Sequence, residues 1–245
     1  MSETNKVAII TGASRGIGSA IAQRLAADGH AVVVNYAGNS DAAARVVELI
    51  EAKGGKSIAV AADVSTAKGA QSLFAAAKDH FGGCDVLVNN AGIMKLATLR
   101  ESADDLFDSQ VAVNLKGTFN MLREGAEQLR SGGSIVNLST SVVGLKLEAY
   151  GVYAATKAAV ETLGAILAKE LRGRSITVNS IAPGPTATEL FFEGKSDELI
   201  ARISKANPLE RLGTPEDIAN AVSFLVGNDG RWINGQTLRA NGGMI

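Results

Sequence analysis

The chain has 245 residues, of which 46% are hydrophobic and 20% are charged, and its formal net charge is −1. This composition is typical of a globular protein with a large core, and it gives no electrostatic basis for binding nucleic acid or an anionic membrane. The single cysteine, Cys84, cannot form a disulfide within the chain, and no apolar run is long enough for a transmembrane helix. Because residues 1–6 also lack the charged-then-apolar pattern of a signal peptide, we expect one domain, residues 1–245, in the cytoplasm.

Short apolar segments and longer amphipathic segments alternate along the chain. The pattern predicts an α/β fold, a doubly wound parallel sheet of about seven strands with helices on both faces. The expected strands cover residues 6–10, 31–36, 57–62, 85–89, 134–138, 175–181 and 236–240. The expected helices begin near Ile17, Ser40, Thr66, Ser102, Tyr150 and Thr214. Residues 186–212 form a long connection, which predicts a lid of short helices over the site.

A glycine-rich turn, T-G-A-S-R-G-I-G at residues 11–18, joins the first expected strand to the first expected helix. Gly12 permits the tight turn, while Gly16 and Gly18 allow the backbone to approach a pyrophosphate group closely. The helix N-terminus supplies amide donors and a favourable dipole for that anion. The turn therefore predicts a dinucleotide-binding site, although a strand-to-helix turn without a ligand can show the same pattern by chance.

The residues at the end of the second expected strand indicate which dinucleotide binds. NAD-specific sites usually carry a carboxylate there, which bonds the adenosine ribose. Here the strand ends in Asn35 and Tyr36 and is followed by Ser40, and Arg15 lies within the glycine turn. A 2′-phosphate would meet a cation and hydrogen-bond donors, so NADP(H) is the expected cofactor.

Tyr153 and Lys157, in the sequence Y-A-A-T-K, are the candidate catalytic pair. Four residues are close to one helical turn, so both side chains lie on the same helix face. A phenol normally keeps its proton to about pH 10, and a nearby ammonium group lowers that pKa. The pair therefore predicts a general acid or base that works near neutral pH. Tyr150 has no lysine four residues later, and we expect it to line the pocket.

Together these motifs resemble the short-chain dehydrogenase/reductase family, in the single-domain branch that includes the 3-oxoacyl-acyl-carrier-protein reductases. The resemblance covers essentially the whole chain and includes the glycine turn, Y-A-A-T-K, Pro183-Gly184 and the N-G-Q-T-L-R-A-N-G-G tail. It implies a Rossmann-type domain that binds NADP(H) and reduces a carbonyl, a ketone or a 3-oxoacyl thioester, to a secondary alcohol by hydride transfer. The alternatives are an NAD-dependent alcohol or sugar dehydrogenase of the same fold and a dinucleotide sensor without turnover.

The resemblance also implies roles for individual residues. Lys157 matches the lysine that bonds the nicotinamide ribose and tunes the tyrosine, and Asn114 matches the asparagine that holds a water in the proton relay. Asp63 and Val64 match the positions that contact the adenine. The expected cofactor contacts are Gly12, Ser14, Arg15, Gly16, Ile17, Gly18, Asn35, Tyr36, Ser40, Asp63, Val64, Asn90, Ala91, Gly92, Tyr153, Lys157, Pro183, Gly184, Thr186 and Thr188.

One hydroxyl group is needed to polarise the substrate carbonyl as charge develops on its oxygen. The cluster of Ser139, Thr140 and Ser141 offers three. Ser141 begins S-V-V-G, which resembles the S-x-x-G of the family, and we assign the role to Ser141. It lies twelve residues before Tyr153, where thirteen is commoner in the family, so Ser139 and Thr140 stay open as alternatives.

The resemblance implies partners as well as a small-molecule carbonyl or alcohol substrate. Arg130 and Arg174 occupy positions similar to carrier-docking arginines of the family, so acyl carrier protein is a candidate partner. We expect a homotetramer in which the helices from Ser102 and Tyr150 form one interface and the C-terminal segment forms another. The two histidines lack metal-ligand spacing, so no metal is expected.

Overall fold

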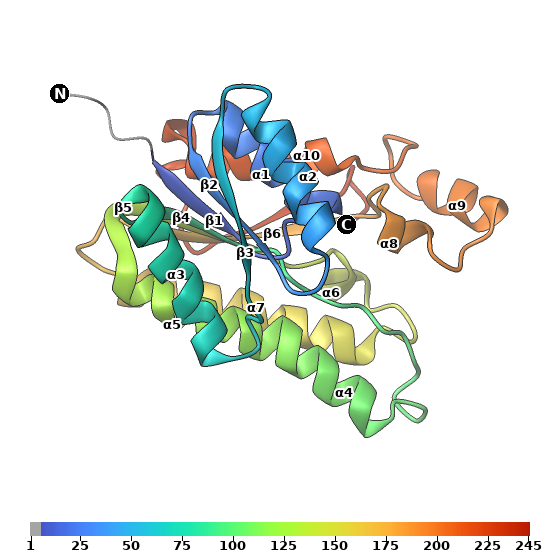
Figure 1. The fold of residues 1–245 in the computed structure, drawn as a ribbon. Coiled ribbons are helices and arrows are strands. Elements are labelled where there is room, and N and C mark those ends of the chain that lie inside the picture. Colours follow the sequence, from blue (N-terminus) through green and yellow to red (C-terminus); the bar gives the residue numbers. More distant parts are fainter. Residues whose placement is uncertain (1–5) are drawn as a thin grey trace.

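The computed structural model describes residues 6–245; residues 1–5, where no signal peptide is expected, lie outside the described residues. Strands β1 to β7 form one sheet in the order β3-β2-β1-β4-β5-β6-β7, and every pair of neighbours is parallel (Figure 1). The predicted doubly wound α/β fold is confirmed. The strands are β1 Val7–Ile10, β2 Ala31–Tyr36, β3 Lys56–Ala61, β4 Cys84–Asn89, β5 Leu129–Leu138, β6 Thr177–Pro183 and β7 Thr237–Ala240.

Helices cover both faces of the sheet (Figure 1). One face is packed against α1 Gly16–Ala27, α2 Ser40–Glu51 and α10 Pro215–Val226, and the other against α3 Ala67–Phe81, α5 Thr118–Gln128 and α7 Gly151–Glu170. Each face has its own cluster of buried apolar side chains, so the sheet lies between two cores. The four residues of β1 are all buried, which agrees with the apolar composition expected of a strand that is covered on both faces.

The carboxyl ends of the strands form the edge at which a ligand site is expected. The chain order of the strands reverses between β1 and β4, and ligands of such sheets bind in the crevice at this reversal. Polar residues begin where the apolar strands end: Thr11 follows β1, Asn89 ends β4 and Ser139 follows β5.

Several predicted boundaries differ from the structure by one or two residues, and two segments differ more. The helix expected from Ser102 contains α4 Asp104–Gln110, a π-helical segment Val111–Gly117 and then α5. Strand β5 begins at Leu129, five residues before the expected start, because Leu129 pairs with Cys84 ahead of an irregularity in the register between Cys84 and Val86. The sequence R-S-G-G at residues 130–133 has the composition of a turn, so hydrophobic periodicity does not indicate this part of the strand.

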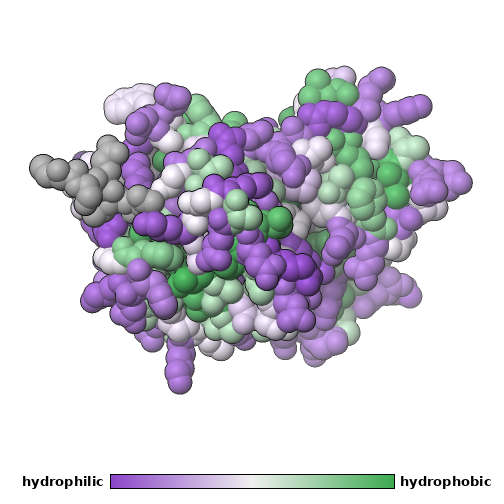
Figure 2. Space-filling view, turned by 45° about the horizontal axis from the view of Figure 1, so that its top comes forward, coloured by the Kyte–Doolittle hydropathy of each residue, from purple (hydrophilic) through white to green (hydrophobic). Residues whose placement is uncertain are grey.

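Residues 186–212 contain two short helices, α8 Glu189–Phe192 and α9 Asp197–Ser204, which project from the main body in Figure 1. Figure 2 shows the surface hollowed between two projecting parts, with apolar side chains gathered on the right-hand part. The last helix begins as expected: Thr214 caps α10, whose first residue is Pro215, in a capping box with Asp217. Within the described residues, no helix has both the length and the apolar character that crossing a membrane requires.

Candidate active site

The glycine turn has a backbone that only glycine adopts without strain. Gly12 and Gly16 have φ angles of +61° and +53°, in the left-handed region. Gly18 has an ordinary φ but no room for a side chain, since a Cβ would lie 2.5 Å from the Asn90 Nδ2 atom. The turn leads directly into α1, whose first backbone N–H groups have no acceptor within the helix and receive no side-chain cap from Arg15. Ser14 and Arg15 lie at its tip, with Arg15 exposed, while Ile17 packs against the core beneath α1.

The segment after β4 is hydrogen-bonded to this turn. Thr11 Oγ1 accepts hydrogen bonds from the backbone N–H groups of Asn90 and Ala91, both at 2.9 Å. Asn90 Nδ2 donates in return to the carbonyl oxygens of Thr11 and Gly12 at 2.8 and 3.0 Å. Residues 11–18 and 90–92 therefore form one bonded unit, in which a Cβ on Gly12 would approach the Ala91 Cα to 2.9 Å.

Asn35 has a different position from the one expected of a cofactor ligand. Its side chain is buried; Oδ1 accepts from the Gly12 N–H at 3.1 Å, and Nδ2 donates to the carbonyl oxygens of Tyr36, Val60 and Ala62. These bonds use both amide hydrogens and fasten the glycine turn to β2 and the end of β3. The structure therefore does not support a contact between the Asn35 side chain and a 2′-phosphate.

Other expected ligands near the end of β2 do face solvent. Tyr36 is half-buried and Ser40 is exposed at the first residue of α2. Ser40 Oγ donates to the Asp41 carboxylate at 3.4 Å, so one carboxylate lies close to the expected phosphate site.

After β3, Asp63 is exposed and accepts from the Ser65 N–H at 2.9 Å. Its neighbour Val64 is buried, and the carbonyl oxygen of Val64 accepts from Asn120.

The segment after β6 extends from the sheet edge to the glycine turn. A Cβ on Gly184 would lie 2.8 Å from the Asn241 Cβ, so this glycine permits close contact with the end of the chain. Thr186 Oγ1 donates to the Gly184 carbonyl oxygen at 3.0 Å. Thr188 caps α8, and its Cγ2 lies 3.5 Å from a Cβ built on Gly16. The segment that is expected to form a lid thus begins directly beside the turn that is expected to hold the pyrophosphate.

Lys157 and Asn114 converge on Gly92. Lys157 is buried, and its Nζ donates to the Leu138 carbonyl oxygen at 2.6 Å. A Cβ on Gly92 would lie 3.2 Å from Asn114 Oδ1 and 3.5 Å from Lys157 Nζ. Burial lowers the pKa of Lys157 to about 8, since the low-dielectric surroundings disfavour the ammonium form.

The expectation that Lys157 lowers the pKa of Tyr153 is wrong for the chain in this structure. Burial raises the pKa of Tyr153 to about 12, and hydrogen bonding to Thr140 offsets only part of that rise. The physical reason is that the phenolate loses its hydration when it is buried, while the Lys157 ammonium donates to Leu138. The Tyr150 ring packs edge-on against Tyr153, with 6.5 Å between the ring centroids.

The three hydroxyl groups after β5 have three different partners, and these partners favour Thr140 over the expected Ser141. Ser141 is buried, donates to the Ala182 carbonyl oxygen at 3.0 Å and accepts from Asn241 Nδ2 at 3.0 Å. Hydrogen bonding with the Thr140 side chain lowers the pKa of the Tyr153 phenol. Ser139 donates to Glu161. The sequence did contain the signal, because Thr140 lies thirteen residues before Tyr153, the spacing commoner in the family.

Asn114 lies in the π-helical segment and is fully buried. Its Oδ1 accepts from the Ile93 N–H at 2.8 Å, and its Nδ2 donates to the Ile93 carbonyl oxygen at 2.9 Å and to Thr156 Oγ1 at 3.3 Å. Gln110, one turn earlier, makes the same two-point contact with the backbone N–H and C=O of Lys95, both at 3.2 Å. No motif in the sequence indicates Gln110, since a lone glutamine in a helix has no characteristic spacing to other polar residues.

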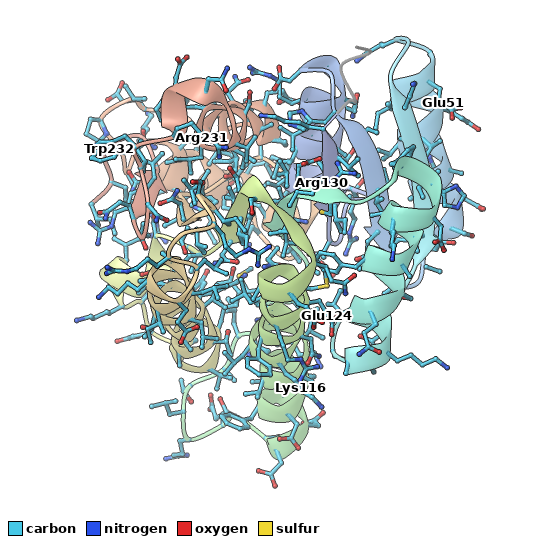
Figure 3. All side chains as sticks on the ribbon, turned by 90° about the vertical axis from the view of Figure 1, so that its left-hand side faces the viewer. Glu51, Lys116, Glu124, Arg130, Arg231 and Trp232 are labelled. Carbon is cyan, nitrogen blue, oxygen red and sulfur yellow. The ribbon has the colours of Figure 1, made fainter. Side chains whose placement is uncertain are left out.

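Several conspicuous residues lie away from this site. Arg130 pairs with Asp85 at 2.9 Å, and Arg174 donates to the carbonyl oxygens of Ala126 and Leu129. Both arginines lie near the start of β5, at the edge of the sheet opposite to its carboxyl ends, and Figure 3 shows Arg130 at that end of the molecule. Cys84, at the start of β4, is buried, which raises the pKa of its thiol to about 12.

The comparisons with known proteins agree over nearly the whole chain. A family model described as enoyl-(acyl carrier protein) reductase matches residues 12–245. The chain is 44% identical to a short-chain type dehydrogenase/reductase of Picea abies, with 98% of this chain and 92% of that protein covered. It is 43% identical to an NADPH-dependent aldehyde reductase-like chloroplastic protein of Arabidopsis thaliana, with 98% and 94% covered. It is 42% identical to the 3-oxoacyl-[acyl-carrier-protein] reductase FabG of Staphylococcus epidermidis, with 98% and 99% covered.

Solved structures show the same likeness in three dimensions. A short-chain dehydrogenase/reductase from Serratia marcescens has a TM-score of 0.93 at 37% identity, with 98% of this chain and 97% of that chain covered. A short-chain dehydrogenase from Burkholderia cenocepacia, solved in complex with NADP, has a TM-score of 0.92 at 36% identity, with 99% of each chain covered.

Proposed function

The chain belongs to the short-chain dehydrogenase/reductase family, and from that membership and the site geometry we propose that it is an NADP(H)-dependent reductase of carbonyl compounds with Tyr153 as the proton donor. The observation that carries the proposal is the meeting of three groups at the carboxyl edge of the sheet. Hydrogen bonding with Thr140 lowers the pKa of the Tyr153 phenol. Lys157 follows one helical turn later on α7, and its Nζ atom lies 3.5 Å from a Cβ built on Gly92. This is the constellation of a general acid with a neighbouring hydroxyl donor and a cation.

The residues of the glycine turn fit a dinucleotide. The left-handed Gly12 and Gly16, the absence of a side chain at Gly18 and the free N–H groups at the start of α1 make a cradle that side chains would fill. Bound NADPH supplies the hydride, and the protein supplies binding, orientation and proton transfer. The cofactor contacts that we propose are those expected from the sequence, except that Asn35 supports the turn from within and its side chain does not reach the ligand.

The proton chemistry follows from the two altered pKa values. Burial keeps the Tyr153 phenol protonated at neutral pH, so it is ready to donate its proton to a substrate oxygen that becomes negative during reduction. Thr140 donates a hydrogen bond to the same oxygen. Lys157, with a pKa of about 8, can exchange its proton near neutral pH and so can restore the phenol. Asn114 has one Oδ1 lone pair left, close to Gly92, with which to hold a water beside Lys157.

The choice of NADP(H) over NAD(H) depends on opposed charges. Arg15 is an exposed cation within the turn, but the Asp41 carboxylate lies beside Ser40. The guanidinium group can bond a phosphate with two parallel N–H groups, whereas the exposed carboxylate is screened by water, so we propose that Arg15 decides the preference. Fluorescence titration tests it: Arg15→Ala should weaken NADPH binding more than NADH binding, and tighter binding of NADH to the unaltered protein would refute the choice.

The proposed substrate is a small-molecule aldehyde or ketone. Relatives at similar identity include both an aldehyde reductase-like protein and a 3-oxoacyl-acyl-carrier-protein reductase. Acyl carrier protein is the less favoured partner, because Arg130 and Arg174 lie away from the site of their own chain and are bonded to their neighbours. NADPH consumption should be measured with aldehydes, diketones, quinones, sugars and acetoacetyl thioesters, with Tyr153→Phe as the control. The variant should bind NADPH and lose about 10²–10⁴-fold in kcat; unchanged kcat would refute the assignment of Tyr153.

A further inference from the structure

Three polar side chains recur at four-residue intervals along the face of α7 that meets the end of β5. They are Tyr153, Lys157 and Glu161. Since four residues are about one helical turn, the three lie above one another on that face. The proposed reaction uses the first two and leaves the third, Glu161, without a role.

The partners of these three side chains are consecutive residues of β5 and its end. Lys157 Nζ donates to the Leu138 carbonyl oxygen, and the Ser139 hydroxyl donates to Glu161 Oε1. Hydrogen bonding with Thr140 lowers the pKa of the Tyr153 phenol. Any shift of Ser139 along or away from α7 would therefore move its two covalent neighbours. Those neighbours carry the Lys157 acceptor and the proposed carbonyl-polarising hydroxyl.

The hydrogen bond between Ser139 and Glu161 is partly shielded from water. Ser139 is buried with 4% of its surface exposed, and Glu161 is half-buried on α7. A hydroxyl that donates to a carboxylate makes a charge-assisted hydrogen bond, which is roughly twice as strong as a neutral one. Its shielding from water strengthens it further.

Thr140 is also held from its other side. Ser141 Oγ donates to the Ala182 carbonyl oxygen of β6 and accepts from Asn241 near the C-terminus, both at 3.0 Å. The two hydroxyls that flank Thr140 thus point to opposite sides of the site, one to α7 and the other to β6. Thr140 Oγ1 itself accepts from the Val142 N–H at 3.3 Å.

We propose that Ser139 and Glu161 are positioning residues, whose hydrogen bond holds the Thr140 hydroxyl and the Leu138 carbonyl in register with Tyr153 and Lys157. The pair does not touch the substrate. This role rests on the proposed carbonyl reduction, because it acts through the groups to which that reaction assigns proton transfer.

Matched variants at both positions test the proposal by kinetics. Glu161→Leu and Ser139→Ala remove the bond, whereas Glu161→Gln keeps an oxygen acceptor and Ser139→Thr keeps a hydroxyl donor. We expect kcat to fall by about 10- to 100-fold in the first two, since small misplacements of catalytic groups have effects of that size, and to stay within about threefold in the conservative pair. The NADPH dissociation constant should change less than kcat in all four, because the glycine turn that is proposed to hold the pyrophosphate group leads into α1 and is not bonded to the pair.

The double variant Ser139→Ala/Glu161→Leu should lose no more kcat than the worse single variant, since both remove one bond. Multiplied losses would overturn the proposal, and so would a lowered melting temperature with unchanged kcat. Crystal structures give a readout without turnover: Thr140 should lie against the Tyr153 hydroxyl in the wild type and move away in Glu161→Leu. An unmoved Thr140 would overturn the proposal whatever the kinetics, whereas unchanged kcat in Tyr153→Phe would refute the reaction and not the positioning.

Discussion

At the level of single residues, the three consecutive hydroxyl groups after β5 each make a different contact. Ser139 bonds to α7, and Ser141 bonds to β6 and the C-terminal segment. Hydrogen bonding with Thr140 lowers the pKa of the Tyr153 phenol. A threonine in this place differs from a serine in its second Cβ substituent, which restricts rotation about χ1. The restriction favours a fixed direction for the hydroxyl group, as an oxyanion donor requires.

Of the three hydroxyl groups, that of Thr140 should therefore affect the rate most when it is removed. Thr140→Val keeps the shape and removes the hydroxyl, and we expect kcat to fall about 10²–10³-fold, whereas Thr140→Ser should retain most activity. Ser141→Ala should lower kcat less but reduce the free energy of unfolding by about 1–3 kcal/mol, since Asn241 and the Ala182 carbonyl each lose a buried partner. Steady-state kinetics and urea unfolding measure both, and a larger loss of kcat in Ser141→Ala would return the role to Ser141.

The pH dependence of reduction should report Lys157. Its pKa of about 8 means that the ammonium form dominates below that pH and is lost as the pH rises through it. The ammonium form of Lys157 can return a proton to the phenolate that reduction leaves on Tyr153, so kcat should be level below about pH 8 and fall above it. Burial raises the pKa of Tyr150, so Tyr150→Phe is a control that should leave the profile in place. A rate that climbs through this range would contradict the assigned direction.

At the level of elements, the junction of α4 and the π-helical segment holds the loop after β4. Gln110 and Asn114 lie one turn apart, and their amide groups bond the backbones of Lys95 and Ile93 in the way that a neighbouring strand would. The same loop is bonded on its other side, where the Ala97 N–H donates to the Ala149 carbonyl oxygen just before Tyr150. The loop is therefore fixed between α4 and the start of α7, beside the proposed proton donor.

Loss of the Gln110 contact should disturb substrate binding more than cofactor binding. Gln110→Leu leaves the Lys95 N–H and C=O without their partner, and we expect the free energy of unfolding to fall by about 1–3 kcal/mol. The substrate KM should rise while the NADPH dissociation constant stays the same, because the loop adjoins Tyr150 and not the tip of the glycine turn. Gln71→Leu, at an exposed position on α3, is the matched control and should be near neutral. Equal effects of the two variants would contradict this account.

At the level of the whole molecule, exposed apolar side chains gather where the sequence predicts interfaces. Phe107 and Phe119 are exposed on α4 and α5, and Ile166 is exposed on α7. Trp232 is 99% exposed shortly before β7, and Figure 3 shows it at the periphery. Exposed apolar side chains that form a contiguous patch often mark association surfaces.

We expect a homotetramer whose mass by light scattering is about four times the 25.2 kDa of the chain. One interface should involve α4, α5 and α7, and the other the C-terminal segment. Phe119→Asp and Trp232→Asp each place a charge in one expected interface, so each should yield dimers, while Leu49→Asp, at an exposed position on α2, should leave the tetramer intact. A monomeric mass for the unaltered protein at micromolar concentration would contradict the prediction.

The sequence by itself determined the features that depend on residues close to one another in the chain. Apolar runs and helical periodicity were sufficient for the strand and helix order, since these patterns follow from local backbone geometry. The glycine turn and the four-residue spacing of Tyr153 and Lys157 are local in the same sense. The thirteen-residue spacing of Thr140 was also present, but the S-V-V-G match outweighed it.

Only the tertiary structure decided which partner each polar side chain meets. Asn35 bonds Ala62, Lys157 bonds Leu138, and Ser139 bonds Glu161, across 27, 19 and 22 residues of sequence. The direction of the Tyr153 pKa was decided in the same way, because desolvation depends on how completely the packed elements enclose the phenol. Hydrogen-bond partners and burial are set by distances between elements, and residue spacing along one element carries no information about those distances.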